Sequence, residues 1–405
     1  MDKASRAIAA STGYLPSLDG WRALAILAVM MAHDLPWALG AHSNASWHGE
    51  GARGVQLFFA ISGLLITTRI LEEERLAGFF DIKRFYVRRF FRIQPAAWAY
   101  LTATCILIAT GVIHDRWGWW LAALFMFANW KYQNPTLLQQ SNFSGHFWSL
   151  AVEEQFYVLL SLFLFVVRKY RLTLLMVLYV LSMIAQKYAV SHGHFPIQVR
   201  RQTQWELRYL VFPAAFAVAL RKETFRFWAL RLVRPWSVAM FWTLMVVTHR
   251  LWVHHSQPGA TAFGGSWFDE ECERYIEILF TLLVASTMLH PAAWTTRLLE
   301  LSPIRFVGKI SYSIYLWHVL FFSRACPETH VTNAVIQALS GWPAKYVATL
   351  CVAVASYYLI ERPMMRLGHR LAPPMRAGRP ELVEPTDGFG SEEVLAVGIH
   401  GDGRG

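Results

Sequence analysis

The sequence predicts an all-α polytopic membrane protein. Of its 405 residues, 55% are hydrophobic and only 16% are charged, whereas an average soluble domain carries about 25% charged residues. Apolar runs close to the ~20 residues that span a bilayer recur along nearly the whole chain. Because these runs are continuous and do not alternate with polar residues, they disfavour an outer-membrane barrel.

The net charge of +11 is explained by Lys and Arg collecting in the cytoplasmic loops of a membrane protein, so no nucleic-acid binding is expected. The four cysteines are scattered, at Cys105, Cys272, Cys326 and Cys351. Their spacing indicates neither a disulfide framework nor a metal site. The N-terminus lacks a signal-peptide pattern, so the first span is expected to act as the insertion signal.

We expect three regions: a polar cytoplasmic arm (1–17), a membrane domain (18–372) and a Pro-, Gly- and acid-rich tail (373–405) that is disordered in the cytoplasm. The apolar runs of the membrane domain predict about ten transmembrane helices. They lie near residues 21–40, 54–71, 95–113, 147–167, 172–190, 206–221, 229–253, 274–290, 306–325 and 342–361.

The most basic segment, 83–92, sets the orientation of these spans. It interleaves Lys and Arg with Phe and Tyr, and the positive-inside rule assigns it to the cytoplasm. Ten spans then place both termini in the cytoplasm, at an inner (cytoplasmic) membrane. Pro95 suits the first turn of the third span. Arg200 and Arg201 fall outside the cytoplasm under this count and speak against it.

The apolar stretch 117–130 is short for a crossing and rich in Trp, which favours membrane interfaces. A crossing here would leave the basic cluster 168–171 outside the cytoplasm. A re-entrant or interfacial helix places that cluster inside, and we favour this second interpretation.

The first span carries the first candidate site. Arg22 lies near its entrance and His33 follows eleven residues later, about 16 Å along a helix. An ionisable side chain at membrane depth is a candidate functional group, and a neutral imidazole can accept a proton from a hydroxyl as a general base. The alternative is a histidine that only hydrogen-bonds a neighbouring helix. Asp34 is adjacent, but neighbours on a helix point about 100° apart.

A second candidate is the segment 146–157, HFWSLAVEEQFY. Two carboxylates, Glu153 and Glu154, are expensive to bury unpaired. They either favour the positive end of a helix, or one of them faces the interior of the bundle. The ten-span topology places Glu153 at a depth similar to that of His33.

The segment 83–92 is also a candidate anion site, because Arg binds phosphate bidentately and Lys adds point charge. The alternative role is anchoring to lipid headgroups. Two further motifs are weak alone. The segment 308–318, GKISYSIYLWH, is typical of interfacial or helix–helix contacts, and an ion pair or a helix stop explains the sequence ERP at 361–363.

Taken together and in order, six segments resemble acyltransferase family 3, integral membrane proteins that transfer acyl groups, commonly acetyl, to sugars. The segments are LDGWRALAIL with the following His33, GVQLFFAISGLLI, FYVRRFFRIQP, HFWSLAVEEQFY, GKISYSIYLWH and ERP. They cover residues 15–366, and the family's ten-span fold agrees with the count above. The membrane domain 18–372 is therefore expected to be the acyltransferase domain.

The resemblance implies catalytic roles. Arg22 and His33 match the Arg and His of the family's first span, with His33 as the base. Glu153 matches the carboxylate after the Trp-Ser-Leu motif. Asp34 is the neighbouring acid that would orient His33.

The resemblance also implies a donor site. Arg89 and Arg92 match the family's cytoplasmic arginine motif, which implies contacts with acyl-CoA phosphates, and Arg84 and Arg88 are expected to join them. Ser62, followed by Gly63, matches the Ser-Gly of the second span. Gln56 departs from the pattern, since many members carry Asp there.

The expected activity is acyl transfer, with acetyl as the expected group, from acyl-CoA to a hydroxyl of a sugar or glycan such as an exopolysaccharide, a lipopolysaccharide or a glycosylated small molecule. Direct attack and an acyl-His intermediate both remain open. No metal is expected, and the oligomeric state is not predicted. Acceptor-binding residues are expected in the outer loops 41–53, 114–146 and 254–273. Because the extra C-terminal esterase-like domain of some relatives is absent, the acceptor is expected to reach the bundle itself.

The rival interpretation is a glycan or small-molecule transporter or flippase without acyl transfer. Transporters often carry paired spans broken by Gly or Pro in two matching halves, and the sequence offers no such pair. A third alternative is a subunit that only conveys the acyl group to an external enzyme.

Overall fold

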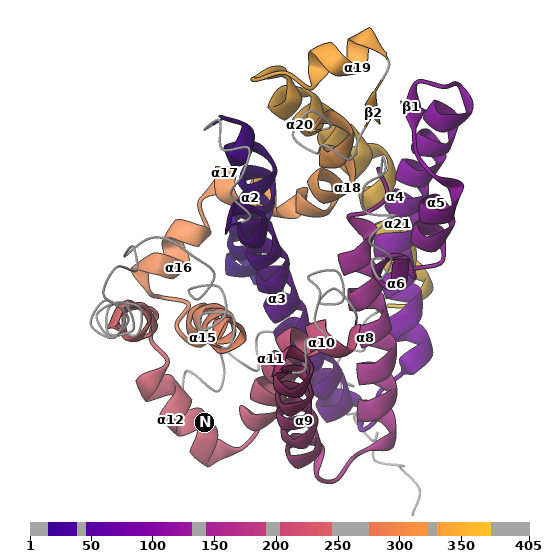
Figure 1. Cartoon of the computed structure of the whole chain (residues 1–405). Helices are drawn as coiled ribbons and strands as arrows, with labels where there is room; N and C mark the ends of the chain where they lie inside the picture. The colour runs from indigo at the N-terminus through magenta and orange to yellow at the C-terminus, as the bar shows by residue number, and fades with distance from the viewer. Residues whose placement is uncertain are drawn as a thin grey trace, which may run out of the picture.

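The computed structural model describes residues 15–38, 46–131, 143–191, 203–244, 275–322, 330–331 and 333–373. Within these ranges the fold is helical except for one antiparallel pair of short strands, β1 (Ile113–His114) and β2 (His330–Val331). Two helices, α2 (Pro16–Ala38) and α3 (Ser46–Ala77), pack along each other in the middle of the molecule (Figure 1).

The other helices surround this central pair. In chain order they are α4 (Ile82–Ala109), α5 (Trp117–Leu124), α6 (Ala128–Lys131), α8 (Phe147–Val166), α9 (Arg171–Ser191), α10 (Thr203–Glu206), α11 (Arg208–Ala219), α12 (Glu223–Leu232), α15 (Ile276–Leu289), α16 (Trp294–Leu299), α17 (Ser302–Lys309), α18 (Ser311–Phe321), α19 (Ala334–Leu339), α20 (Ala344–Ser356), a π-helix (Tyr357–Glu361) and α21 (Arg362–Leu371). In Figure 1, α19, α20 and the strand pair lie at one end, and α9 and α12 reach the opposite end.

Apolar helices identify a membrane protein. Among the described residues, three helices are long and apolar enough to cross a bilayer: Arg53–Ala77, Phe147–Val166 and Ala344–Leu371. Three shorter apolar helices accompany them, at Arg171–Gln186, Arg208–Ala219 and Ile276–Leu289. The outer faces of α8 and α9 expose Leu, Val and Ile side chains, as expected of surfaces that face lipid. The ten crossings and their orientation stay a prediction.

The start of α4 corrects the sequence analysis. The third span was expected to begin at Pro95, after a basic loop at 83–92, but one helix runs from Ile82 to Ala109 with Pro95 inside it. Asp81 sets the true beginning, because its side chain accepts a hydrogen bond from the backbone N–H of Arg84 at 3.0 Å. The basic residues therefore lie along one helix that also enters the bundle.

The stretch 117–130 forms two short helices, α5 and α6, with a turn at Met126, whose φ is +57°. At ~1.5 Å per residue, the eight residues of α5 extend about 12 Å, well short of a ~30 Å hydrocarbon core. The segment does not form a single crossing helix, and its placement as a re-entrant or interfacial element remains a prediction.

Three other expected spans have different bounds. Non-helical residues 233–234 interrupt the expected span 229–253, because a residue before proline, here Pro235, disfavours helical geometry. The expected span 306–325 divides at Ile310 into α17 and α18. At the other end, α20 continues through the π-helix into α21, so the sequence ERP is not a helix stop: Pro363 occupies a first-turn position of α21.

Several expectations lie outside the described residues. These are the arm up to residue 14, the tail from residue 374, residues 39–45 and 245–274, and the cysteines Cys272 and Cys326.

Three consecutive acids fasten the end of α3 to three neighbouring elements. Glu72 pairs with Arg221 at 3.1 Å, Glu73 with Arg88 at 2.9 Å and Glu74 with Arg171 at 2.6 Å. Successive helical side chains point about 100° apart, so adjacent residues reach α4, α9 and the end of α11 at once.

Close backbone approach joins α17 to α2. A Cβ placed on Gly308 would lie 1.8 Å from the carbonyl oxygen of Asp19, so only glycine allows this contact. The GKISYS motif is thereby packed directly on the LDGWR motif. Gly63 plays the same part between α3 and α11, where a Cβ would lie 2.6 Å from the carbonyl oxygen of Leu210.

We expect Gly308→Ala to lower the stability of the protein by about 1–3 kcal/mol, because the added methyl group forces α17 away from α2. The measurement is the thermal denaturation midpoint of the purified protein in detergent. Val347→Ala, at a side chain that is 59% exposed, serves as the control and should leave the midpoint unchanged. An unchanged midpoint in Gly308→Ala would contradict the close packing.

Asp115 makes stability depend on pH. It joins the turn after β1 to the segment before α8, accepting hydrogen bonds from the backbone N–H of Phe143 at 2.9 Å and from the Ser144 hydroxyl at 3.4 Å. Burial raises the pKa of its carboxyl from 3.8 to about 7. Between these values the folded state holds a proton that the unfolded state has released, so stability falls as pH rises.

We expect the denaturation midpoint of the wild type to decrease between about pH 4 and pH 7, and Asp115→Asn to remove part of that decrease. Glu223→Gln is the control, since the Glu223 side chain is 92% exposed. Identical pH profiles for the wild type and Asp115→Asn would show that Asp115 titrates normally.

Candidate functional site

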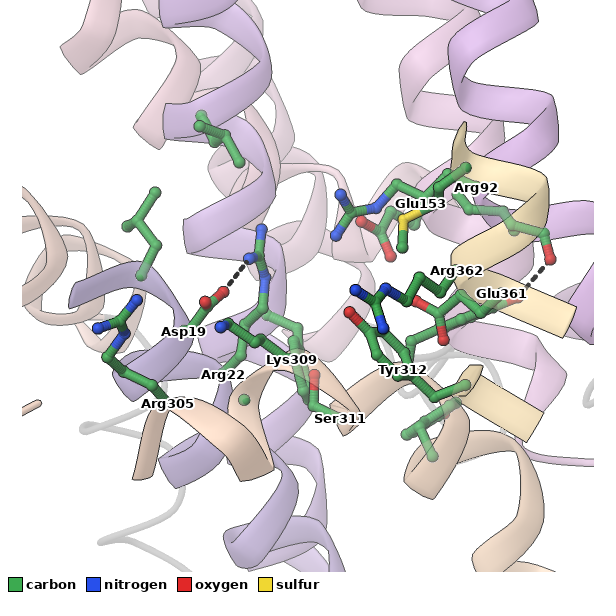
Figure 2. Close-up of a pocket in the computed structure, with 18 of the residues that line it drawn as sticks. Asp19, Arg22, Arg92, Glu153, Arg305, Lys309, Ser311, Tyr312, Glu361 and Arg362 are labelled. Atoms are coloured by element: carbon green, nitrogen blue, oxygen red, sulfur yellow. Dashed lines mark hydrogen bonds and ion pairs between the residues drawn. The ribbon is translucent and has the colours of Figure 1, made fainter. Parts of the chain in front are cut away.

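A cavity of about 700 Å³ opens between α2, α3, α4, α8, α17, α18 and α21; we call it cavity 1. Its most prominent property is positive charge. Seven cationic side chains line it, Arg22, Arg69, Arg89, Arg92, Arg305, Lys309 and Arg362, against three acids, Asp19, Glu153 and Glu361. Figure 2 shows Arg22, Arg305 and Lys309 along one wall and Arg92 and Arg362 along the opposite wall.

Three of these cations have a partner or an orienting contact in the protein. Arg22 pairs with Asp19 at 3.0 Å. Arg89 pairs with Glu153 at 3.2 Å and approaches Glu154 at 3.6 Å. Arg362 lies over the ring of Tyr358.

Arg69 and Arg92 differ from these. Within the described residues neither forms a hydrogen bond or an ion pair, and both are exposed to the space of the cavities. Arg69 is close enough to four other arginines for their charges to repel it, namely Arg22, Arg88, Arg89 and Arg92. A cluster of like charges at membrane depth is unfavourable without an anion to offset it, so this wall is suited to an anionic ligand.

Glu153 lies in this cluster. Ser62 and Tyr157 both donate hydrogen bonds to its carboxylate, and the Arg89 guanidinium lies 3.4 Å from the centre of the Tyr157 ring. Because Glu153 and Glu154 follow the first turn of α8, which starts at Phe147, the charge of the helix end does not explain them.

His33 lies in a different group, with the imidazoles of His318 and His146. The ring centroids of His33 and His318 are 5.1 Å apart, and those of His318 and His146 are 5.7 Å apart. His318 is fully buried and His146 is 9% exposed. His33 lines neither cavity. The sequence predicted a similar depth for Glu153 and His33, and their contacts differ: Glu153 accompanies Arg89, and two histidines accompany His33.

Backbone contacts fix the tautomers of two imidazoles. The Nδ1 atom of His33 lies 2.8 Å from the Val29 carbonyl oxygen, and that of His318 lies 2.7 Å from the Tyr315 carbonyl oxygen. A carbonyl only accepts hydrogen bonds, so Nδ1 carries the proton in both rings. The Nε2 atom of neutral His33 therefore has a lone pair that can accept a proton.

A short layer separates the histidines from cavity 1. Tyr315 and Ser149 line the cavity and share a hydrogen bond of 2.7 Å. The Tyr315 hydroxyl also lies 2.8 Å from the carbonyl oxygen of His146, and its ring packs against the rings of His146 and His318. The cavity thus ends one side chain away from the histidine group.

Asp34 turns away from His33. Its carboxylate accepts hydrogen bonds from the ammonium of Lys345 and the hydroxyl of Tyr346, both on α20. The Lys345 and Asp34 side chains are 8% and 10% exposed, so the ion pair is buried. These contacts assign Asp34 to holding α2 against α20.

The remaining predicted residues occupy several places. Arg84 pairs with Asp81 at 3.2 Å and lines neither cavity. Arg88 and Ser62 line a second cavity beside the first. Gln56 is buried, and its Oε1 atom has no hydrogen-bond partner among the described residues.

Two weak sequence motifs meet at the cavity. Ser313 of GKISYSIYLWH donates a hydrogen bond of 2.9 Å to Glu361 of ERP, and Tyr312 donates one to the carbonyl oxygen of Ile93. The sequence analysis assigned no role to His146 and His318, although both stand in quoted motifs, and it did not single out Arg69. An arginine inside an otherwise apolar run is the signal that identifies Arg69.

Comparison with known proteins supplies a family. The family model described as "Acyltransferase domain" matches residues 15–361. The chain is 28% identical over 373 residues to YrhL of Bacillus subtilis (strain 168), provisionally named a peptidoglycan O-acetyltransferase, covering 88% of this chain and 56% of YrhL. It is also 28% identical over 384 residues to the peptidoglycan O-acetyltransferase OatA of Listeria monocytogenes, covering 88% of this chain and 57% of OatA.

A Staphylococcus aureus protein (strain COL), provisionally named an O-acetyltransferase, is 27% identical over 332 residues, covering 76% of this chain and 51% of that protein. The chain thus spans little more than half the length of these curated relatives. No solved structure matches the chain.

We expect Lys345→Met to destabilise the protein by about 3–5 kcal/mol, because it leaves the Asp34 carboxylate buried without its partner. The double variant Asp34→Asn/Lys345→Met removes both charges and should recover most of that loss. The measurement is the denaturation midpoint in detergent.

The double variant also separates structure from catalysis. If it folds and retains acyl transfer, Asp34 acts only in packing. A folded double variant that has lost acyl transfer would instead indicate that Asp34 takes part in catalysis.

Proposed function

The chain belongs to the acyltransferase domain family, and from that membership we propose that it transfers an acetyl group from acetyl-CoA to a hydroxyl of a cell-envelope glycan. The proposed location is the inner (cytoplasmic) membrane. The names of the relatives, which refer to O-acetylation and in two cases to peptidoglycan, support acetyl as the group and a polysaccharide as the acceptor.

The main support for acetyl-CoA as the donor is the positive charge of cavity 1. Its seven cations exceed its acids by four, and two of its arginines lack a protein partner within the described residues. CoA carries its negative charge on phosphates, and arginine forks bind phosphates bidentately. The basic residues that the topology prediction places in the cytoplasm, including Arg89, Arg305 and Arg362, gather around this cavity, on the side from which CoA would enter.

In the proposed reaction His33 is the general base. Its Nε2 atom accepts the proton of the glycan hydroxyl, and the oxygen attacks the thioester carbonyl carbon. The new C–O ester bond forms, the C–S bond breaks, and the CoA sulfur leaves as a thiolate that takes up the proton from His33. The base is regenerated and no other reactant is required.

The donor has to pass Tyr315 and Ser149 to meet His33, because this pair ends cavity 1. We assign the CoA phosphates to Arg22, Arg69, Arg89 and Arg92. Glu153 orients Arg89 through their ion pair. The thioester then lies at the Tyr315 end, and the acceptor approaches His33 from the other side. This arrangement brings two substrates from opposite faces to one imidazole.

We expect His33→Ala to lower acetyl transfer at least 10²-fold, the usual contribution of a general base, while the protein remains folded. The measurement is acetyl-CoA turnover by the purified protein in lipid, with and without total cell glycan, for the wild type and the variant.

Val347→Ala is the control, since the Val347 side chain is 59% exposed and lines neither cavity. Turnover that depends on His33 and increases with glycan supports the proposal. Retained glycan acetylation in a well-folded His33→Ala protein would overturn the role of His33, and absence of both CoA binding and turnover in the wild type would overturn the donor.

A further inference from the structure

A second cavity of about 430 Å³ lies next to cavity 1; we call it cavity 2. Both cavities are lined by the same four arginines, Arg22, Arg69, Arg89 and Arg92. These four residues, called the arginine wall below, therefore surround the place where the two cavities meet. A ligand whose charge lies in its middle could hold the wall and extend an arm into each cavity.

Cavity 2 has a basic side and an apolar side. Three further cations, Arg88, Arg221 and Arg226, face two acids, Glu72 and Glu73. The apolar lining comes from the ends of α11 and α15 and includes Ala217, Leu220, Met288 and Leu289. This combination suits a flat heteroaromatic ring next to a phosphate.

The acids of cavity 2 leave part of its positive charge unsatisfied. Glu73 binds Arg88 and Glu72 binds Arg221, which orients these two guanidinium groups. Among the residues that the structure describes, the Arg226 guanidinium pairs only with Glu223, at 4.0 Å, and the Glu223 side chain is 92% exposed. Such an exposed pair contributes little, so Arg226 is available to a ligand.

We propose that cavity 2 binds the adenosine 3′-phosphate end of CoA, with the 3′-phosphate on Arg226 and adenine on the apolar side. The shared arginine wall holds the pyrophosphate, and the pantetheine arm extends through cavity 1 toward Tyr315. This inference rests on the proposed function, since it divides the acetyl-CoA molecule between two adjoining cavities.

The ligand's own order of groups supports this division. In CoA the pyrophosphate stands between the nucleoside and the pantetheine arm, just as the arginine wall surrounds the place where the cavities meet. Cavity 1 leads to the histidine group and must take the reactive arm. Cavity 2 reaches neither Tyr315 nor Ser149 and is left for the unreactive nucleoside.

The test compares acetyl-CoA with acetyl-3′-dephospho-CoA as donors for the full-length protein in lipid. The wild type should show a KM about tenfold or more higher for the donor without the 3′-phosphate, the range expected for one charge-assisted phosphate contact. Arg226→Gln should raise the KM for acetyl-CoA by a similar factor, with kcat unchanged, and leave the KM for the dephospho donor as it was. Arg226→Lys, which keeps the charge, should restore part of the affinity.

Arg231→Gln is the matched control, because Arg231 lies on the same helix but stacks on Phe227 and lines neither cavity. It should leave both KM values unchanged. A wild type that uses both donors equally, or an Arg226→Gln variant that affects both donors alike or neither, overturns the placement but leaves the acetyl-CoA reaction intact. A wild type that uses neither donor refutes the proposed function itself.

Discussion

Arginine at membrane depth is stable only when water, a carboxylate or a bound anion offsets its charge, and this constraint shapes the centre of the molecule. Four arginines from α2, α3 and α4 surround the place where two cavities meet. Two of these arginines form ion pairs with carboxylates: Arg22 pairs with Asp19, and Arg89 pairs with Glu153. The positive charge that remains is directed into open space, where it can recognise a ligand.

The arginine wall requires rigid support, and the rest of the fold provides it. Three successive glutamates fix one end of α3, a buried Asp34–Lys345 pair fixes α2 to α20, and a glycine contact fixes α17 to α2. Glu73 and Arg88 are 15 residues apart, whereas the other contacts join elements far apart in the sequence, such as Glu74 with Arg171. Together they hold the elements that carry Arg22, Arg69 and His33 in a fixed relation, which a site built on several helices needs.

Local sequence signals predicted the helices well where one signal acted alone. The apolar runs of α8, α9 and α15 were placed within a few residues. Competing signals explain the differences: Asp81 caps α4 fourteen residues before Pro95 and overrides the proline as a start signal, and Pro235 divides an apolar run.

The motifs supplied candidate residues for the site but not their partners. Asp34 and Lys345 are 311 residues apart, and no helical periodicity reveals such a contact. The neighbours of His33 depend on how α18 packs against α2 and α8, which its own sequence segment does not reveal. Tertiary packing alone determines that Glu153 belongs with the arginines and that His146 and His318 belong with His33.

The hydrogen bond between Tyr315 and Ser149 has a consequence for the membrane itself. A water-filled cavity on one side and a polar group on the other would, if connected, form a path for protons and small ions through the bilayer. Around this bond the rings of Tyr100, His146, His318 and Phe322 pack in contact, and the gap is closed by side chains. In a helix bundle that crosses a bilayer, such a packed layer interrupts any continuous polar path past the Tyr315–Ser149 hydrogen bond.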